Sequence, residues 1–228
     1  MHTQRDKLLE INKEINNKIK ELNFLNYYPK VIAVSKTFSI DKIQPLIDMG
    51  HSDFGENRVQ EAYEKWNNVK NEKIKLHLIG KLQTNKVNKA VGTFDVIQTV
   101  DSIRLAEKIN KRAQALEIYQ PIFIQINIGE DSNKSGMPPK SVYKEIETIT
   151  KLKHVHLLGI MTILPLGLNE QTNQQLFKKT KDIQVKVQTK ISPTCKFLSM
   201  GMSGDYKLAL KEGATHIRIG TKLYGNRK

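Results

Sequence analysis

The stretch Val31-Ile-Ala-Val-Ser-Lys36-Thr37 sets the pattern that this chain repeats: a short apolar run, a polar residue at its end and then a turn. An unbroken run rich in β-branched side chains is typical of a strand that is covered on both faces. Lys36 then stands at the carboxyl end of the first strand, where α/β folds place their chemistry. A lysine set against apolar walls there can present a neutral amine to a carbonyl, whereas a solvated lysine only ends the strand.

The alternation of strand and helix continues to the end of the chain. The predicted strands are 31–35, 52–55, 75–80, 94–99, 121–127, 155–162, 196–200 and 215–219. Helical spacing lies between them and no hairpin signal joins two strands, which indicates a parallel sheet. Eight such units in 228 residues favour an α/β fold of the (β/α)8 TIM barrel type over an open doubly wound sheet. No GxGxxG follows the first strand, which further disfavours a Rossmann fold.

An amphipathic segment precedes the first strand. Apolar residues spaced by three and four predict a helix over 4–25, with Leu8, Ile11, Ile15, Ile19 and Leu22 on one face. We expect the segment 1–25 to be an extra helix packed on the barrel. Because no Pro-, Gly- or Ser-rich linker divides the chain, we expect 1–228 to form a single domain.

The composition excludes several classes of function. The net charge is +14, but only six of the 37 basic residues are arginines and the lysines are spread over the whole chain, so we expect no specific nucleic-acid binding. No run of 18 apolar residues and no secretory signal is present, so we expect no membrane association. The single cysteine, Cys195, fits a reducing compartment, and we expect a cytoplasmic protein. No spacing of His, Cys and carboxylates suggests a metal site.

Two glycine-containing loops follow the last two predicted strands, where barrels often bind phosphate. They read Ser199-Met-Gly-Met-Ser203-Gly204 and Arg218-Ile-Gly220-Thr221. Glycine lets the backbone approach an anion, and each loop adds a hydroxyl and opens a helix. The alternative is that these are ordinary turn and cap residues.

Arg218 lies within the last predicted strand and needs an acceptor if it points into a barrel. A ligand's ring nitrogen, a phosphate or a carboxylate would serve, and an internal ion pair with Glu56 is the alternative. His77, on the third predicted strand, is more typical of a hydrogen-bonded core histidine than of a base.

Lys36, the two loops and Arg218 together describe a pocket for a phosphorylated aldehyde, and pyridoxal 5′-phosphate fits it. Lys36 would form the Schiff base, the loops would hold the phosphate and Arg218 would meet the pyridine nitrogen. An arginine at that nitrogen leaves the ring incompletely protonated and therefore a weaker electron sink.

From about residue 30 onward the chain resembles the YggS/PROSC family of pyridoxal phosphate homeostasis proteins. The resemblance rests on the segments 33–37, 54–61, 77–86, 133–136, 159–162, 198–205 and 218–221. Two positions depart from the family pattern: Leu76 stands where an aromatic residue is expected, and Arg58 where tyrosine is common.

The resemblance implies a barrel like the N-terminal domain of alanine racemase, with pyridoxal 5′-phosphate bound through Lys36 and Arg218 at the ring nitrogen. The residues that it places around the phosphate are Ser199, Gly201, Ser203, Gly220 and Thr221. It places Asn57 and Met200 along the ring. It also implies a carrier or regulator of vitamin B6 without catalytic turnover, so we assign no catalytic residue and expect apo forms of pyridoxal phosphate enzymes as recipients and a monomeric state.

A pyridoxal phosphate-dependent amino-acid racemase is the alternative function. Two-base racemisation needs a second base, which alanine racemases supply as a tyrosine from a C-terminal domain. The sequence ends at Lys228, and its only late tyrosines are Tyr206 and Tyr224, so we expect no racemase activity. Lys134, in the polar loop 129–139, is a candidate second acceptor or release lysine; an ordinary solvated lysine is the alternative.

Overall fold

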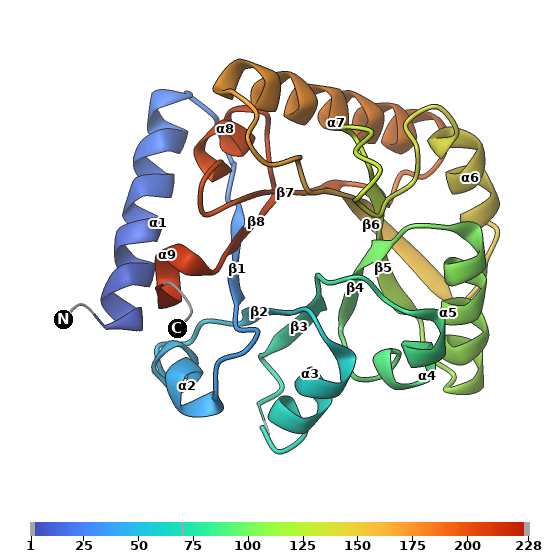
Figure 1. Cartoon of the computed structure of the whole chain (residues 1–228), viewed down its shortest axis with the longest axis horizontal. Coiled ribbons are helices and arrows are strands. Elements are labelled where there is room, and N and C mark those ends of the chain that lie inside the picture. Colours follow the sequence, from blue (N-terminus) through green and yellow to red (C-terminus); the bar gives the residue numbers. More distant parts are fainter. Residues whose placement is uncertain (1–2, 70, 226–228) are drawn as a thin grey trace.

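The computed structural model describes residues 3–69 and 71–225, and its centre is a closed barrel of eight parallel strands (Figure 1). The strands are β1 (Lys30–Val34), β2 (Asp53–Glu56), β3 (Lys75–Leu78), β4 (Val96–Val100), β5 (Gln120–Ile126), β6 (Val155–Thr162), β7 (Phe197–Met202) and β8 (His216–Ile219). Each strand pairs with the next along the chain, and β8 returns to β1 in the register Lys30 to His216. The predicted TIM barrel is confirmed.

Helices connect the strands and surround the barrel (Figure 1). They are α1 (Gln4–Glu21), α2 (Ile40–Asp48), α3 (Val59–Trp66), the 3₁₀ helix η1 (Thr84–Lys86), α4 (Val87–Ala90), α5 (Ile103–Ala115), α6 (Val142–Ile149), α7 (Glu170–Lys190), α8 (Tyr206–Lys211) and α9 (Thr221–Tyr224). Side-chain caps start two of the long helices. Ser102 accepts a hydrogen bond from Leu105 N before α5, and Asn169 accepts one from Thr172 N before α7.

The main hydrophobic core lies between the strands and the helices, because alternate strand residues point outward. Ala33 and Leu198 belong to this layer together with buried residues of every helix from α1 to α9. The barrel interior holds a much smaller apolar cluster of Val96, Phe123 and Met161. Much of the remaining interior is polar, which is unusual for a TIM barrel core and indicates a functional reason.

Helix α1 lies on the outside of the barrel beside β1 and β8 and packs against α2, α8 and α9 (Figure 1). Its capping box at Thr3 and Asp6 fixes the start of the helix. Glu14 joins it to α8 and α9 by accepting hydrogen bonds from Tyr206 Oη and Lys222 Nζ. The helix ends at Glu21, four residues before the predicted end.

No helix in 3–69 and 71–225 combines the length and the apolarity that crossing a membrane requires.

Candidate functional site

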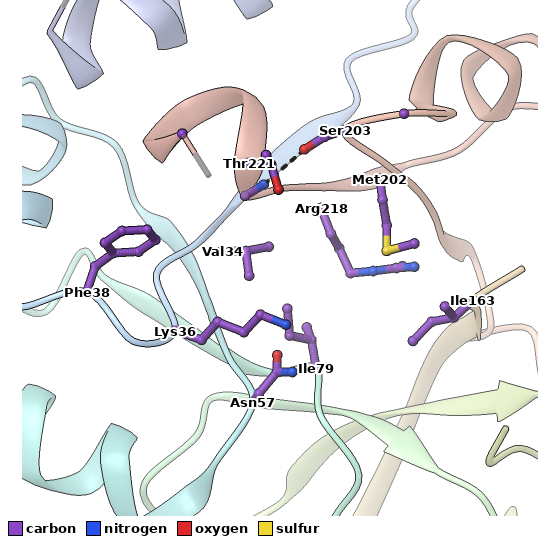
Figure 2. A pocket seen from close by; sticks show the side chains of 13 residues that line it. Val34, Lys36, Phe38, Asn57, Ile79, Ile163, Met202, Ser203, Arg218 and Thr221 are labelled. Carbon is purple, nitrogen blue, oxygen red and sulfur yellow. Dashed lines mark hydrogen bonds between the residues drawn. The ribbon is translucent and has the colours of Figure 1, made fainter. Parts of the chain in front are cut away.

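A cavity of about 320 Å³ opens at the carboxyl ends of the strands, on the rim where barrels of this type bind ligands. Loops that follow β1, β2, β3, β6, β7 and β8 all contribute to its wall (Figure 2). The lining residues are Val34, Lys36, Phe38, Asn57, Ile79, Ile163, Met202, Ser203, Gly204, Arg218, Gly220, Thr221 and Gly225. Six of the nine residues predicted to bind the cofactor are therefore gathered around one space.

Lys36 sits in a tight turn directly after β1. Phe38 N donates to Ser35 O at 3.1 Å, and the residue after the lysine, Thr37, has φ = +68°. That φ is the value that the third residue of a type II turn takes, and glycine is usual there. The turn carries the Lys36 side chain over the cavity, where it extends toward Asn57 and Ile79 with Arg218 on the opposite wall (Figure 2).

Arg218 is 3% exposed, and two buried partners inside the barrel bind its guanidinium. Nη1 donates to Ser199 Oγ at 2.7 Å and Nη2 donates to Thr162 O at 2.8 Å. Burial lowers the pKa of Arg218 to about 10, so the group is still positively charged at neutral pH. The site thus holds a buried cation that reaches the cavity wall, and neither hydrogen-bond partner is an anion.

The alternative ion pair between Arg218 and Glu56 is wrong. Glu56 instead pairs with Lys65, whose Nζ lies 2.9 Å from Glu56 Oε1. No ion pair found within 3–69 and 71–225 includes Arg218. A ligand in the cavity with a hydrogen-bond acceptor or a negative charge would therefore give this buried cation a partner.

A chain of buried hydrogen bonds leads from Arg218 into the barrel. Ser199 Oγ, which accepts from Arg218, donates to Gln98 Oε1 at 2.6 Å. The Gln98 amide lies 3.0 Å from His77 Nδ1, and His77 Nε2 lies 3.1 Å from Asp53 Oδ1. Since Gln98 Nε2 can only donate, His77 Nδ1 accepts and Nε2 carries the proton that it donates to Asp53. His77 is thus the hydrogen-bonded core histidine that the sequence predicts.

Asp53, at the far end of this series of hydrogen bonds, is ionised at neutral pH. Burial raises the pKa of Asp53, but hydrogen bonds from His77 and Ser52 and the charge of Lys30 outweigh burial and hold the pKa well below its usual value. Next to it, burial lowers the pKa of His216 to about 3. His216 is therefore neutral inside the barrel at ordinary pH.

The end of the cavity at α9 consists of glycines and hydroxyls. Ser203 Oγ accepts a hydrogen bond from Gly220 N at 3.3 Å (Figure 2) and another from Lys222 N at 3.4 Å. These bonds tie the loop after β7 to the loop after β8. Two accepted bonds leave the hydroxyl proton of Ser203 available to donate. Thr221 and Gly204 complete this wall. Hydroxyl and backbone donors near a buried cation suit an oxyanion.

Three of the nine predicted residues are not among the residues that line the cavity. Met200 is fully buried in the outer core, because alternation turns it away from the barrel axis. Ser199 is fully buried beneath Arg218. Gly201 has φ = +89°, and a Cβ there would lie 2.6 Å from Ala209 Cβ, so this glycine permits α8 to pack on β7.

The apolar wall of the cavity was not predicted. It consists of Val34, Phe38, Ile79, Ile163 and Met202. Val34 could have been found, since it alternates with the outward-facing Ala33. Met202 could not, because the positive φ of Gly201 and the register shift between β7 and β8 break the alternation just before it.

Two further expected residues have distinct positions. Asn57 lines the cavity, and a Cβ at Gly80 would lie 2.2 Å from Asn57 O, so the close approach of these two loops requires glycine. Lys134 does not line the cavity; its Nζ donates to Leu164 O at 2.6 Å. Lys134 therefore joins the loops that follow β5 and β6.

Arg58 and Leu76, which depart from the family pattern, also lie outside the cavity lining. Arg58 is exposed at the start of α3, and Leu76 is buried in the outer core.

Comparison with known proteins agrees with this geometry. The family model described as the N-terminal domain of alanine racemase matches residues 13–228. A pyridoxal phosphate homeostasis protein of Aquifex aeolicus is 37% identical over 199 residues, which cover 87% of this chain and 87% of that protein. A human protein of the same name is 35% identical over 213 residues, covering 87% of this chain and 77% of the human protein.

Solved structures resemble the chain as well. PipY of Synechococcus elongatus, solved with pyridoxal phosphate bound, superposes with a TM-score of 0.82 at 37% identity, covering 92% of this chain and 100% of PipY. An alanine racemase of Clostridium difficile superposes with a TM-score of 0.72 at 19% identity, covering 94% of this chain and 56% of the racemase. The likeness to the racemase is one of fold.

Proposed function

Because the chain belongs to the family of pyridoxal phosphate homeostasis proteins, which share the N-terminal domain fold of alanine racemase, we propose that it binds pyridoxal 5′-phosphate in this cavity and supplies it to other proteins. The observation that carries the proposal is the placement of Lys36 and Arg218 on facing walls of one cavity whose end is built of hydroxyls and glycines (Figure 2). The cofactor-bound structure of PipY supports it.

Lys36 is the residue that holds the aldehyde, as a Schiff base. Its amine nitrogen forms the bond to the aldehyde carbon, and the aldehyde oxygen leaves as water. The reverse reaction needs only water, so the bond keeps the cofactor and still allows its release. When bound, pyridoxal 5′-phosphate supplies this aldehyde and a ring that withdraws electrons.

The other lining residues bind and orient. Arg218 donates to the ring nitrogen and, because it is a permanent cation, disfavours a proton on that nitrogen. Ser203, Gly204, Gly220 and Thr221 surround the phosphate. Asn57 and the apolar side chains of the wall enclose the ring.

The three predicted residues that lie outside the lining have indirect roles in this proposal. Ser199 positions Arg218, whereas Gly201 and Met200 support the loop after β7 through packing.

The residues that line the cavity favour reversible binding of the cofactor without turnover over racemisation. Among the lining residues that the structure describes, Lys36 and Arg218 are the only ionisable ones, and an arginine does not act as a base near neutral pH. Tyr206 donates to Glu14 on the outside of the barrel, and the ring of Tyr224 stacks on Phe38 with its hydroxyl buried. Neither tyrosine lines the cavity as a second base would.

The proposed partners follow from this role. A protein that holds pyridoxal 5′-phosphate reversibly would deliver it to apo forms of pyridoxal phosphate enzymes, and we propose that it does so as a cytoplasmic monomer without specific nucleic-acid binding. The lone thiol, Cys195, is buried, and burial raises its pKa to about 12, which makes it an inert core residue in such a compartment.

A transfer experiment tests the function. The protein is loaded with pyridoxal 5′-phosphate, freed of unbound cofactor and mixed with an apo-aminotransferase. Recovery of aminotransferase activity in proportion to the loaded protein supports the proposal. Loaded protein that leaves the apo-enzyme inactive, or that interconverts D- and L-alanine at a rate linear in its own concentration, contradicts it.

A further inference from the structure

Two carboxylates and one lysine lie directly beside the turn that carries Lys36. We call Glu56, Glu61 and Lys65 the Lys65 cluster. Lys65 Nζ lies 2.9 Å from Glu56 Oε1 and 3.3 Å from Glu61 Oε1. The side chain of Glu56 is 0% exposed and that of Lys65 is 9% exposed, so this ion pair is nearly dry. No cavity-lining residue belongs to the cluster.

The cluster binds the residues on both sides of Lys36. On the side of β1, Ser35 Oγ donates to Glu56 Oε1 at 2.7 Å and Lys65 Nζ donates to Ser35 O at 2.9 Å. On the other side, Thr37 N donates to Glu61 Oε1. The backbone of Lys36 is therefore fixed at both of its peptide bonds by one connected set of charges.

The conformation that is held in this way is an unfavourable one. Thr37 has φ = +68°, and a β-branched residue with positive φ is a genuine outlier. Such a conformation is strained and persists only where the surroundings over-determine it. The hydrogen bond from Thr37 N to Glu61 is one contact that fixes this residue.

Lys65 is the member on which the other two depend. Glu56 and Glu61 form ion pairs with Lys65 and with no other cation among the ion pairs of the described residues. Without Lys65, two carboxylates would face each other beside a dry turn. Glu56 also accepts from Trp66 Nε1 at 3.1 Å, but an indole cannot neutralise its charge.

We propose that Lys65 is a positioning residue for Lys36: through Glu56 and Glu61 it holds the strained turn 35–38 so that the amine meets the aldehyde of the ligand. The inference rests on the proposed function and deepens it. It separates two contributions to affinity. The phosphate contacts and most of the ring contacts are made by other loops, whereas formation of the Schiff base depends on where the turn places Lys36.

Two ligands measure these contributions separately. Pyridoxal 5′-phosphate can form the Schiff base, and pyridoxine 5′-phosphate, with an alcohol in place of the aldehyde, can only bind non-covalently. The ratio of their dissociation constants reports the gain from the covalent bond. In Lys65→Met this ratio is expected to fall at least tenfold, while the affinity for pyridoxine 5′-phosphate changes less than threefold.

Matched variants control for general damage. Lys18→Met removes an ion-paired helix lysine outside the cavity, where Lys18 Nζ lies 2.6 Å from Glu21 Oε2, and it should leave the ratio unchanged. Thr37→Gly relieves the backbone strain, so adding it to Lys65→Met should recover part of the ratio. If Lys65→Met does not fold, Glu61→Gln, at a side chain that is 25% exposed, tests the same cluster and should lower the ratio.

The outcomes are distinct. An unchanged ratio in Lys65→Met, or in Glu61→Gln if the first variant does not fold, overturns the inference, and so does an equal loss of affinity for both ligands. If wild-type protein binds neither ligand, the proposed function itself fails. If wild-type protein binds both and the variants match it, only the role of Lys65 fails.

Discussion

Ser199 Oγ lies 2.7 Å from Arg218 Nη1 and accepts a hydrogen bond from it, so this hydroxyl, which the family resemblance places near the phosphate, holds the arginine of the cavity wall. The same oxygen donates to Gln98 Oε1, which fixes its orientation. Ser199 is fully buried, so loss of its hydroxyl would remove the partner of Arg218 Nη1 and of Gln98 Oε1.

Replacing this hydroxyl should weaken cofactor binding without abolishing it. We expect Ser199→Ala to raise the dissociation constant for pyridoxal 5′-phosphate about tenfold, because a buried hydrogen bond to a charged group contributes about 1.5–3 kcal/mol and part of it can be replaced by water. Titration followed by the visible absorption of the bound cofactor measures the change. Ser192→Ala, at a buried serine bonded to Thr194 away from the cavity, serves as the control. Wild-type affinity in Ser199→Ala would refute the positioning role.

Gly201 should be required for stability. Ala at this position places Cβ 2.6 Å from Ala209 Cβ in a backbone with φ = +89°, so Gly201→Ala is expected to lower the free energy of unfolding by about 1–3 kcal/mol. Urea unfolding measures it. Gly204→Ala is the matched control, since its Cβ meets no atom within 4 Å and the expected change is within about 0.5 kcal/mol. Equal stability of the two variants would contradict the close packing of α8 on β7.

His216 should make the fold sensitive to mild acid. Its folded pKa, about 3, lies below that of the unfolded chain, about 6.5, so between these values the unfolded state binds the additional proton. Stability from neutral His216 is present above pH 6.5 and is lost as the pH falls, by up to about 1.4 kcal/mol per pH unit. Asp53 adds to the loss below about pH 4, because its folded pKa is depressed.

Urea unfolding at pH 7 and pH 5 of the wild-type protein and of His216→Gln tests the effect. The variant is expected to lose less stability between the two pH values than the wild type. An equal loss in both proteins would show that another group causes the acid sensitivity.

The barrel could be predicted because its signals are local and repeated. The alternation of apolar runs with helical spacing fixed the class, and strand β1 was found almost to the residue at 31–35. The same local patterns placed Lys36 and Arg218 at one rim, since the carboxyl ends of parallel strands share an edge.

What the sequence could not reveal depends on tertiary contacts. Asp53, His77 and Gln98 come from three strands, and only the barrel register joins them to Ser199. The turn at Thr37 was equally hidden, because threonine disfavours a positive φ and the carboxylate that fixes it, Glu61, lies 24 residues away. The family resemblance named the segment that contains Met200, and only the alternation along β7 shows that this side chain packs in the outer core.

Both proposals depend on covalent attachment of pyridoxal 5′-phosphate to Lys36. The most direct test is reduction of the loaded protein with borohydride, which converts a Schiff base into a stable secondary amine, followed by peptide mapping. We expect one modified peptide in the wild-type protein, with the label on Lys36, and no label at Lys134 in Lys36→Ala. Stoichiometric label on another lysine of the wild-type protein, or full labelling of Lys36→Ala, would contradict it.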